Sequence, residues 1–356
     1  MWRLISLTGV VFIFSYVGSY ADTRSQFDKM LMPREKTAEK KIPTDEVSLN
    51  KSYLIIVESI REGLEEAAEE CKHQFRWDRW NCPVTSTNIV SKSRQSQATR
   101  EVAFLQSVSA AGIMYSVTES CNRADNALCS CGDGGKFHYG HDTLHWKWGG
   151  CSHNVQFGEK VSRLYLGTGK ASADISNALK SHNERAGHKT VKHTMKTTCK
   201  CHGVTGSCQM RTCWKHMSNF RLIGDKLRKK FKRAKDLRHM RGFMPYTNKV
   251  RHPKLTKISK DDLVHFEDSP LYCETDNASG YLGTLGRECL KLEKGANKSS
   301  MSKFERHSCR RLCNECGHRV GRHLVREEYD CDCEFRWCCS VQCRRCTRDV
   351  TRYYCK

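Results

Sequence analysis

Twenty-two cysteines constrain the folding of this 356-residue chain more than any other feature. They start at Cys71 and are even in number, which in an oxidising compartment indicates a disulfide framework, eleven pairs if none is free. Only 38% of the residues are apolar, cysteine included, so cross-links must supplement a core that is thin for the length. Each bridge contributes about 2–4 kcal/mol.

The first residues direct the chain to such a compartment. A short basic start with Arg3 precedes a mostly apolar stretch at 4–17 and small residues at 19–21, the pattern of a secretory signal peptide. This segment is too short to span a bilayer, and no later stretch is long and apolar enough to do so. We therefore expect a secreted protein of the extracellular space and matrix.

The net charge of +22 indicates a polyanionic partner. In a cytosolic chain this would be nucleic acid, but no zinc-finger, RNA-recognition or basic-zipper pattern is present. Outside the cell the abundant polyanions are sulfated glycans, so we expect glycan contact and no nucleic acid. Plain solvated charge is the alternative.

The positions of the cysteines predict two separately cross-linked domains. Ten lie between Cys71 and Cys213, none between Trp214 and Tyr272, and twelve between Cys273 and Cys355, so each group can close internally. The predicted organisation is a signal peptide at 1–21, a mobile N-terminal arm at 22–48, a helical N-terminal domain at 49–220, a basic connector at 221–262 and a cysteine-rich C-terminal domain at 263–356.

Apolar side chains at helical spacing predict helices throughout the first domain. The connector begins with an amphipathic basic helix and holds fifteen Lys or Arg against two acids over 221–260, which fits glycan or acidic-lipid contact or a solvated face. The stripes are Ile56, Ile60, Leu64 and Ala68; Ala98, Val102, Leu105, Val108 and Tyr115; Phe157, Val161 and Leu164; Ile175 and Leu179; and Phe220, Leu227, Phe231 and Ala234.

The resulting fold class is α+β and disulfide-rich. A helical N-terminal domain with a disulfide-tied hairpin is followed by a small cystine-knot-like β C-terminal domain. Ten cysteines between Cys309 and Cys355 are too dense for regular helices, so short strands and hairpins are expected there.

Two Cys-x-Cys pairs, at 199–201 and 331–333, have either metal ligation or disulfides as their explanation. The signal peptide favours disulfides, and we expect no metal. On a strand both cysteines of such a pair face the same side. Nested bridges Cys201–Cys208 and Cys199–Cys213 would then make a stiff hairpin at 199–214, and its tip would present the hydroxyls of Thr205 and Ser207.

The segment CKCHGVTGSCQMRTCW at 199–214 resembles the acylated hairpin of Wnt proteins. Other Wnt-like stretches follow in the same order and together cover nearly everything from residue 50 onward, and the spacing of the last third is most similar to the eighth Wnt subfamily. They are CKHQFRWDRWNCP at 71–83, ATREVAFLQSVSAAGIMY at 98–115, WGGCSHNVQFG at 148–158, SPLYC at 269–273, GTLGREC at 283–289 and FRWCCSVQC at 335–343.

The resemblance implies a lipidated receptor ligand. Porcupine, an acyltransferase of the endoplasmic reticulum, would attach a covalent palmitoleate, and Wntless would carry the protein out; no other cofactor is implied. The hairpin would act as a thumb that places the lipid in a groove of the Frizzled cysteine-rich domain, with a lipoprotein-receptor-related co-receptor bound elsewhere. The implied thumb contacts are His202, Gly203, Val204, Thr205 and Gly206.

Thr205 occupies the acceptor position, where Wnt proteins usually carry serine. It keeps the hydroxyl but is more crowded and stiffer, because threonine is β-branched. We favour Thr205 as the acylated residue, with Ser207 as the alternative. An ordinary turn threonine in an unlipidated ligand is the remaining interpretation.

The resemblance also implies a finger at 331–346, in which adjacent Cys338 and Cys339 form a vicinal disulfide. Phe335, Trp337 and Val341 would then project as an apolar receptor-binding tip. The alternative for Trp337 is a core position, since aromatic side chains usually lie inside.

The remaining disulfides are implied by the resemblance alone, and together with the pairs above they use every cysteine. They are Cys71–Cys82, Cys121–Cys129, Cys131–Cys151, Cys273–Cys316, Cys289–Cys309, Cys313–Cys355, Cys331–Cys346 and Cys333–Cys343.

Three sequons begin at Asn50, Asn277 and Asn297 and are candidates for glycosylation. Asn277 and Asn297 lie in polar loops, which suits the modification. Asn50 abuts a predicted helix start and could instead cap it.

We expect no enzymatic activity. The chain has no nucleophile elbow, no His-Glu-x-x-His pair and no phosphate loop, and Cys201 beside His202 cannot be a nucleophile once it is disulfide-bonded. The competing function is an extracellular glycan-bound inhibitor or structural protein, which the basic connector and the disulfide density also permit.

Overall fold

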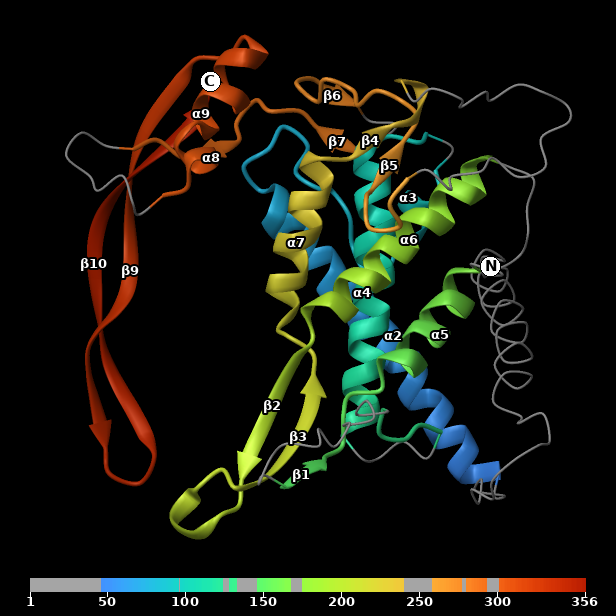
Figure 1. Cartoon of the computed structure of the whole chain (residues 1–356). Helices are drawn as coiled ribbons and strands as arrows, with labels where there is room; N and C mark the ends of the chain where they lie inside the picture. Colours follow the sequence, from blue (N-terminus) through green and yellow to red (C-terminus); the bar gives the residue numbers. More distant parts are fainter. Residues whose placement is uncertain are drawn as a thin grey trace, which may run out of the picture. The chain divides into compact units, whose positions relative to one another are not determined.

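The computed structural model describes residues 46–95, 97–123, 128–132, 146–167, 175–239, 258–276, 280–292 and 301–356. These form two compact units (Figure 1). Unit 1 comprises Met1–Cys71 and Val84–Asp268, and unit 2 comprises Lys72–Pro83 and Ser269–Lys356. No helix in the described ranges is long and apolar enough to cross a membrane. The predicted signal peptide, and the arm up to residue 45, lie outside the described residues.

The first unit is a helical bundle built around α4, as the periodicity predicts (Figure 1). Nearly every side chain of α4 from Glu101 to Thr118 is buried, and α3, α5, α6 and α7 pack on it. Asparagine or threonine caps begin α4, α5 and α7. The helices are α2 (Glu46–Phe75), α3 (Ile89–Ser93), α4 (Arg100–Asn122), α5 (Val155–Leu166), α6 (Ile175–Thr194) and α7 (Phe220–Lys232).

Helix α7 corrects the predicted connector. Its apolar stripe is buried, and the ring of Phe231 meets Phe104 of α4 edge-on at 6.0 Å. The segment 221–239 is therefore part of unit 1, because a stripe of this kind is stabilised only when it is covered. Residues 258–268 also belong to unit 1, where Val264 packs with Leu179 and Leu237. The rest of the predicted connector, 240–257, lies outside the described residues.

Two small sheets complete the first unit. In one, β3 (Met210–His216) lies between β1 (Trp146–Gly149) and β2 (Lys196–Cys201). It runs antiparallel to β2 and parallel to β1. In the other, β4 (Lys235–Asp236) pairs with β5 (Val264–His265). The first sheet joins the hairpin to the helices.

The second unit is dominated by one long antiparallel hairpin, β9 (Val320–Arg336) and β10 (Ser340–Cys355). Strand β8 (Glu288–Cys289) pairs with the end of β10. Strands β6 (Thr275–Asp276) and β7 (Tyr281–Leu282) form a separate ribbon, and α8 (Lys303–Arg306) and α9 (Ser308–Leu312) precede the hairpin.

The cysteine-rich segment therefore differs from the short strands that we predicted there. Short helices carry part of the disulfide set, and the two main strands are long. Ion pairs join Arg326 to Asp349 and Arg345 to Asp330 across them. Alternating charges of this kind allow a two-stranded ribbon to remain in water.

Cystine supplies most of the core of the second unit. Cys289, Cys309, Cys313 and Cys355 cluster around Leu312.

The α+β, disulfide-rich class is confirmed. Nine of the pairs stated above are present: Cys121–Cys129, Cys131–Cys151, Cys199–Cys213, Cys201–Cys208, Cys273–Cys316, Cys289–Cys309, Cys313–Cys355, Cys331–Cys346 and Cys333–Cys343. Cys71 and Cys82 are also disulfide-bonded.

Close helix packing predicts a severe effect of Gly112→Ala. A Cβ at Gly112 would lie 2.2 Å from the carbonyl oxygen of Gly63 on α2. We expect a loss of about 1–3 kcal/mol, the usual cost of overpacking, measured as a fall in melting temperature. Gly321→Ala is the control, because its Cβ would meet nothing closer than 3.6 Å. Equal stability of both variants would contradict the packing argument.

A carboxylate cluster predicts that stability falls as pH rises. Burial, and then repulsion by Glu119, Glu70 and Glu62, raise the pKa of Glu66 from 4.5 to about 7. The folded chain therefore keeps a proton that the unfolded chain releases. This contribution is complete below pH 4.5 and is lost as pH rises through 7.

Melting temperatures measured from pH 5 to pH 8 should show this fall, and Glu66→Gln should flatten it. Glu65→Gln is the matched control, since Glu65 is exposed and pairs with Arg61. An unchanged slope in the Glu66→Gln protein would rule out this assignment.

Candidate functional site

The β2–β3 hairpin, which we call the thumb (199–214), is locked by two cross-links (Figure 1). Cys199 lies directly opposite Cys213, with 4.0 Å between their Cα atoms, and these two cysteines are bonded. The second bond, Cys201–Cys208, closes the tip. Both predicted bridges are confirmed, and they exclude metal ligation and nucleophilic chemistry at Cys201 because a bonded sulfur is not a thiolate.

Backbone hydrogen bonds hold the tip as a short turn around η1 (Val204–Gly206). The amide of Gly203 donates to the carbonyl of Ser207 at 2.9 Å, and the amide of Gly206 donates to the carbonyl of Gly203 at 3.0 Å. Gly206 has a φ of +79°, a value that glycine adopts without a steric penalty. The turn is therefore closed by its own backbone as well as by the disulfides.

Thr205 is held in a conformation that threonine disfavours. Its φ is +58°, in the left-handed region, and a β-branched residue there costs about 1–3 kcal/mol. Its hydroxyl is exposed and donates to the carbonyl of Val204 at 2.6 Å. Because the turn and both cross-links impose this backbone, the Thr205 hydroxyl remains presented to solvent.

Ser207 is placed differently. It is half-buried with ordinary backbone angles, and a Cβ on Gly203 would lie 2.1 Å from its hydroxyl oxygen. The Ser207 hydroxyl thus packs against the backbone of the turn. Of the two hydroxyls, that of Thr205 is the accessible one.

The other predicted thumb residues surround Thr205. Val204 is 86% exposed at the apex. His202 is exposed, and its Nε2 lies 2.9 Å from the hydroxyl oxygen of Thr212 on the facing strand. Sequence analysis did not identify Thr212 or the exposed Met210. The alternation of residues along the strand could have identified Met210 and Thr212 as lying on one face of β3, because successive residues of a strand face opposite sides.

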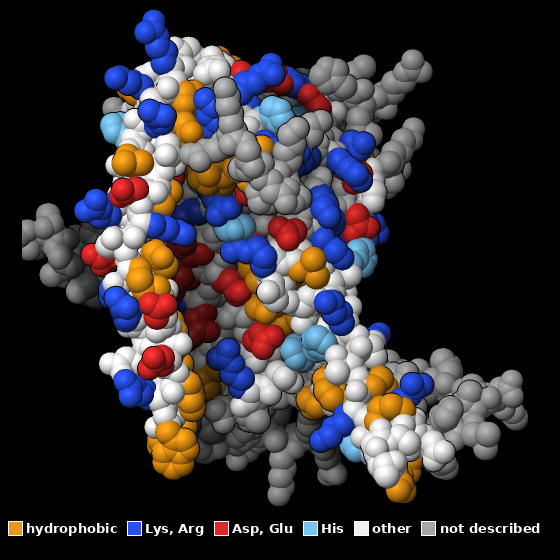
Figure 2. Space-filling model, turned by 90° about the vertical axis from the view of Figure 1, so that its left-hand side faces the viewer, with side chains coloured by type: hydrophobic (Ala, Val, Ile, Leu, Met, Phe, Trp, Pro, Cys, Tyr) orange, Lys and Arg blue, Asp and Glu red, His pale blue; other side chains and the backbone are white. Residues whose placement is uncertain are grey.

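The end of the long hairpin, which we call the finger (331–346), carries an apolar cluster (Figure 2). Phe335 pairs with Val341 across the strands, and they are 70% and 65% exposed. Trp337 in the turn is 93% exposed, which excludes the alternative of a core position. Disulfides Cys333–Cys343 and Cys331–Cys346 brace the strands behind this tip.

The predicted vicinal disulfide is absent, and Cys338 and Cys339 are free, exposed thiols. The three-residue turn between β9 and β10 places both in the left-handed region, with φ of +78° and +82°. Hairpin turns favour such positive values because they match the strand twist. Closure of the turn, and not a ring between adjacent sulfurs, therefore sets the backbone here.

Asn277 and Asn297 lie outside the described residues. Asn50 lies inside α2, which begins at Glu46, so Asn50 is not at the N-cap position. Glycosylation at all three remains a prediction.

Comparison with known proteins decides the family. The sequence model of the wnt family matches residues 39–356. The chain belongs to the Wnt family. Protein Wnt-8b of Homo sapiens is 42% identical over 307 residues, which cover 86% of each chain. Protein Wnt-8a of Danio rerio is 40% identical over 312 residues, covering 86% of this chain and 84% of the relative.

A solved structure described as human WLS in complex with WNT8A is similar to this Wnt chain. The TM-score is 0.62 at 36% identity, and the match covers 86% of this chain and 96% of that chain. The resemblance to the eighth subfamily is therefore supported by both sequence and fold. As a Wnt ligand, the protein is a secreted signalling molecule.

The exposure of the finger predicts that its apolar side chains contribute little to the stability of the Wnt fold. Phe335→Ala and Trp337→Ala should each change the free energy of unfolding by less than about 0.5 kcal/mol, the usual limit for surface substitutions. Denaturant unfolding would measure this. Phe104→Ala is the contrasting variant, because Phe104 is fully buried in α4 and its removal should cost about 3–5 kcal/mol.

Proposed function

We propose that this Wnt ligand carries a palmitoleate ester on Thr205 and binds a Frizzled cysteine-rich domain through thumb and finger together. The observation that carries the proposal is the exposed hydroxyl of Thr205 on a turn closed by two disulfides. An acyltransferase needs a hydroxyl that it can reach from solvent, and the hydrogen bond of Thr205 to its neighbour Val204 leaves the residue exposed. The half-buried Ser207 is a poorer acceptor.

The lipid would supply much of the affinity. Each buried methylene is worth about 0.8 kcal/mol, so an acyl chain in a receptor groove contributes several kcal/mol. A single chain holds a protein at a membrane only weakly and reversibly. The same lipid can therefore pass from a membrane or carrier to the receptor.

The finger would provide the second contact. Large apolar side chains exposed on a disulfide-braced turn are typical of binding hot spots, which concentrate affinity in a few residues. Phe335, Trp337 and Val341 have this character. The Cys338 and Cys339 thiols lie in the same turn and would face the receptor with them.

Partners in secretion and signalling follow from the family. The solved complex contains human WLS with a Wnt relative of this chain, which supports Wntless as its carrier. Porcupine would be the acyltransferase. A lipoprotein-receptor-related protein would be the co-receptor, bound away from the two tips.

Sulfated glycans are the proposed extracellular polyanion. Lys229, Lys232 and Arg233 are exposed at the end of α7, opposite its buried stripe. Clustered positive charges attract sulfate groups, and dissolved salt limits the distance over which this attraction acts. Such contact would hold the ligand in the matrix without using either tip.

Thr205→Ala should abolish acylation and lower Frizzled affinity. Loss of even four buried methylenes is worth about 3 kcal/mol, which is more than a hundredfold in affinity. Mass spectrometry of the reduced and digested secreted protein should find a palmitoleoyl increment on the Thr205 peptide, and hydroxylamine should remove it. Binding to a purified cysteine-rich domain measures the affinity.

Two variants serve as controls. Thr205→Ser keeps the hydroxyl and relieves the β-branched strain, so it should be acylated at least as fully. Ser207→Ala should leave both the lipid and the affinity unchanged. An unmodified Thr205 peptide in a protein that binds sulfated glycans would instead favour an extracellular glycan-bound inhibitor or structural protein.

A further inference from the structure

Segment 72–83 belongs to unit 2, although the residues on both sides of it in sequence belong to unit 1. The chain therefore passes between the two units three times, after Cys71, after Pro83 and after Asp268. A single passage would leave the two units tethered by one linker. What holds segment 72–83 inside unit 2 therefore decides whether the units are joined by three chain passages or in effect by one.

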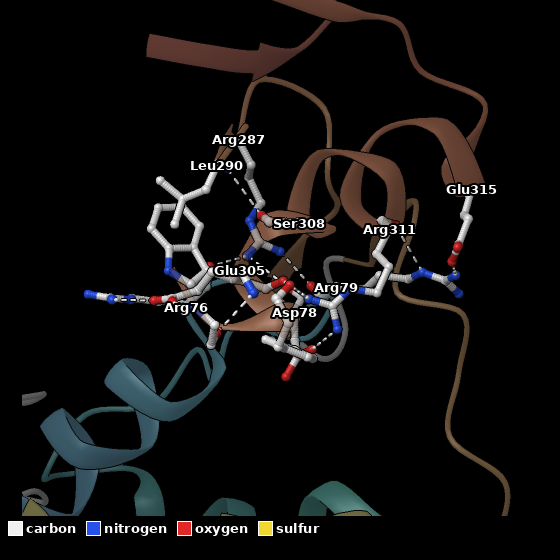
Figure 3. Close-up of polar contacts among 12 residues, drawn as sticks. Arg76, Asp78, Arg79, Arg287, Leu290, Glu305, Ser308, Arg311 and Glu315 are labelled. Carbon is white, nitrogen blue, oxygen red and sulfur yellow. Dashed lines mark hydrogen bonds and ion pairs between the residues drawn. The ribbon is translucent and has the colours of Figure 1, made fainter. Parts of the chain in front are cut away.

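Arg287 is the central contact of this segment within unit 2 (Figure 3). Its Nη2 donates to the carbonyls of Arg76 at 3.1 Å and Asp78 at 2.8 Å, and its Nη1 donates to the carbonyl of Arg79. Tyr281 lies beside it and donates its hydroxyl to the same Arg79 carbonyl. One guanidinium thus binds three carbonyls of a segment more than two hundred residues away in sequence.

Ion pairs surround this contact at its edges. Each joins a side chain of segment 72–83 to α8, α9 or the turn that follows (Figure 3). They are Arg76–Glu305 at 3.3 Å, Asp78–Arg311 at 3.5 Å and Arg79–Glu315 at 2.5 Å. Partly exposed pairs of this kind contribute little singly, so the carbonyl contacts of Arg287 are stronger than any one of these pairs.

The burial of Arg287 restricts which side chain can replace it. Desolvation lowers the pKa of Arg287, opposed by the nearby Tyr281 and Asp78. A cation taken out of water requires partners for its N–H groups, and the planar guanidinium can reach several carbonyls at once. A lysine ammonium cannot reproduce that fork.

Arg287 is also fixed to the strand that carries the finger. Its carbonyl accepts from the amide of Cys355 in β10 at 3.0 Å. The next two residues form β8, which pairs with Tyr353 and Tyr354 of β10. A continuous set of hydrogen bonds within unit 2 thus leads from segment 72–83 through the side chain and carbonyl of Arg287 to the finger strand.

We propose that Arg287 is a positioning residue that couples unit 1, which carries the thumb, to the finger strand through segment 72–83. The inference rests on the proposed two-contact binding of a receptor. When two contacts are linked stiffly, the second forms at a high effective concentration, and this advantage falls when the link loosens. Arg287 would thereby raise affinity without touching the receptor.

Arg287→Lys in the full acylated protein tests the coupling. Hydrogen exchange of the amides in 72–83 should rise about tenfold, equivalent to losing one hydrogen bond to a charged group, while exchange in the disulfide-braced finger stays unchanged. Affinity for a Frizzled cysteine-rich domain should fall about tenfold. Arg326→Lys is the matched control, because Arg326 is 73% exposed and its 3.3 Å pair is with Asp349, which makes no ion pair with segment 72–83.

A double-mutant cycle with the finger adds a readout that a merely structural role would not move. If Arg287 couples the contacts, Trp337→Ala should cost less affinity in the Arg287→Lys protein than in the wild type. Should Arg287→Lys fail to be secreted, Tyr281→Phe removes one bond to the Arg79 carbonyl and should change exchange and affinity in the same direction.

Three outcomes would overturn the inference: unchanged exchange in 72–83, raised exchange with full receptor affinity, or equal costs of Trp337→Ala in both backgrounds. Failure of the proposed function is distinguishable from these. In that case the wild-type acylated protein itself would not bind the receptor domain, whereas the exchange measurement on the free protein would still report whether Arg287 holds the segment.

Discussion

Disulfides take the place of a hydrophobic core at both tips on which the proposed function depends. The thumb and finger strands are largely exposed, so no buried apolar surface holds them together. Cys199–Cys213 and Cys333–Cys343 join facing strands at Cα separations of 4.0 Å. Because these bonds restrict the unfolded chain as well as the folded one, two ribbons persist in water that hydrogen bonds alone would leave marginal.

That rigidity explains how the thumb keeps a residue in an unfavourable backbone conformation. Thr205 stays left-handed because the surrounding turn and its cross-links over-determine its conformation. Helical packing supplies the firm base behind it, since α4 is buried along most of its length and contacts α2 through Gly63 and Gly112. A cross-linked tip on a packed helical bundle thus holds its exposed residues in a fixed conformation, which suits a ligand.

The long helices of unit 1 could be predicted because each has a periodic apolar stripe, and the stripes at Ile56, Val102 and Phe220 are buried as expected. The predicted connector was wrong over 221–239. The prediction gave more weight to the high charge of this segment than to its apolar stripe, which packs in the helical bundle. The Cys338–Cys339 bond was wrong because pairing was inferred from resemblance, whereas the turn sets the backbone there. Met210 and Thr212 were missed because their surroundings depend on strand pairing, with β1 for both residues and also with β2 for Thr212.

The sequence by itself determined the long helices of unit 1, the two cysteine groups, the thumb hairpin with hydroxyl residues at its tip and the Wnt family, because spacing and residue type are local properties. Only the tertiary structure decided that Thr205 is accessible while Ser207 is packed, that Trp337 is exposed, and that segment 72–83 joins the second unit through Arg287. Those outcomes depend on contacts between residues far apart in the chain, and no local pattern records which distant carbonyl a buried guanidinium will bind.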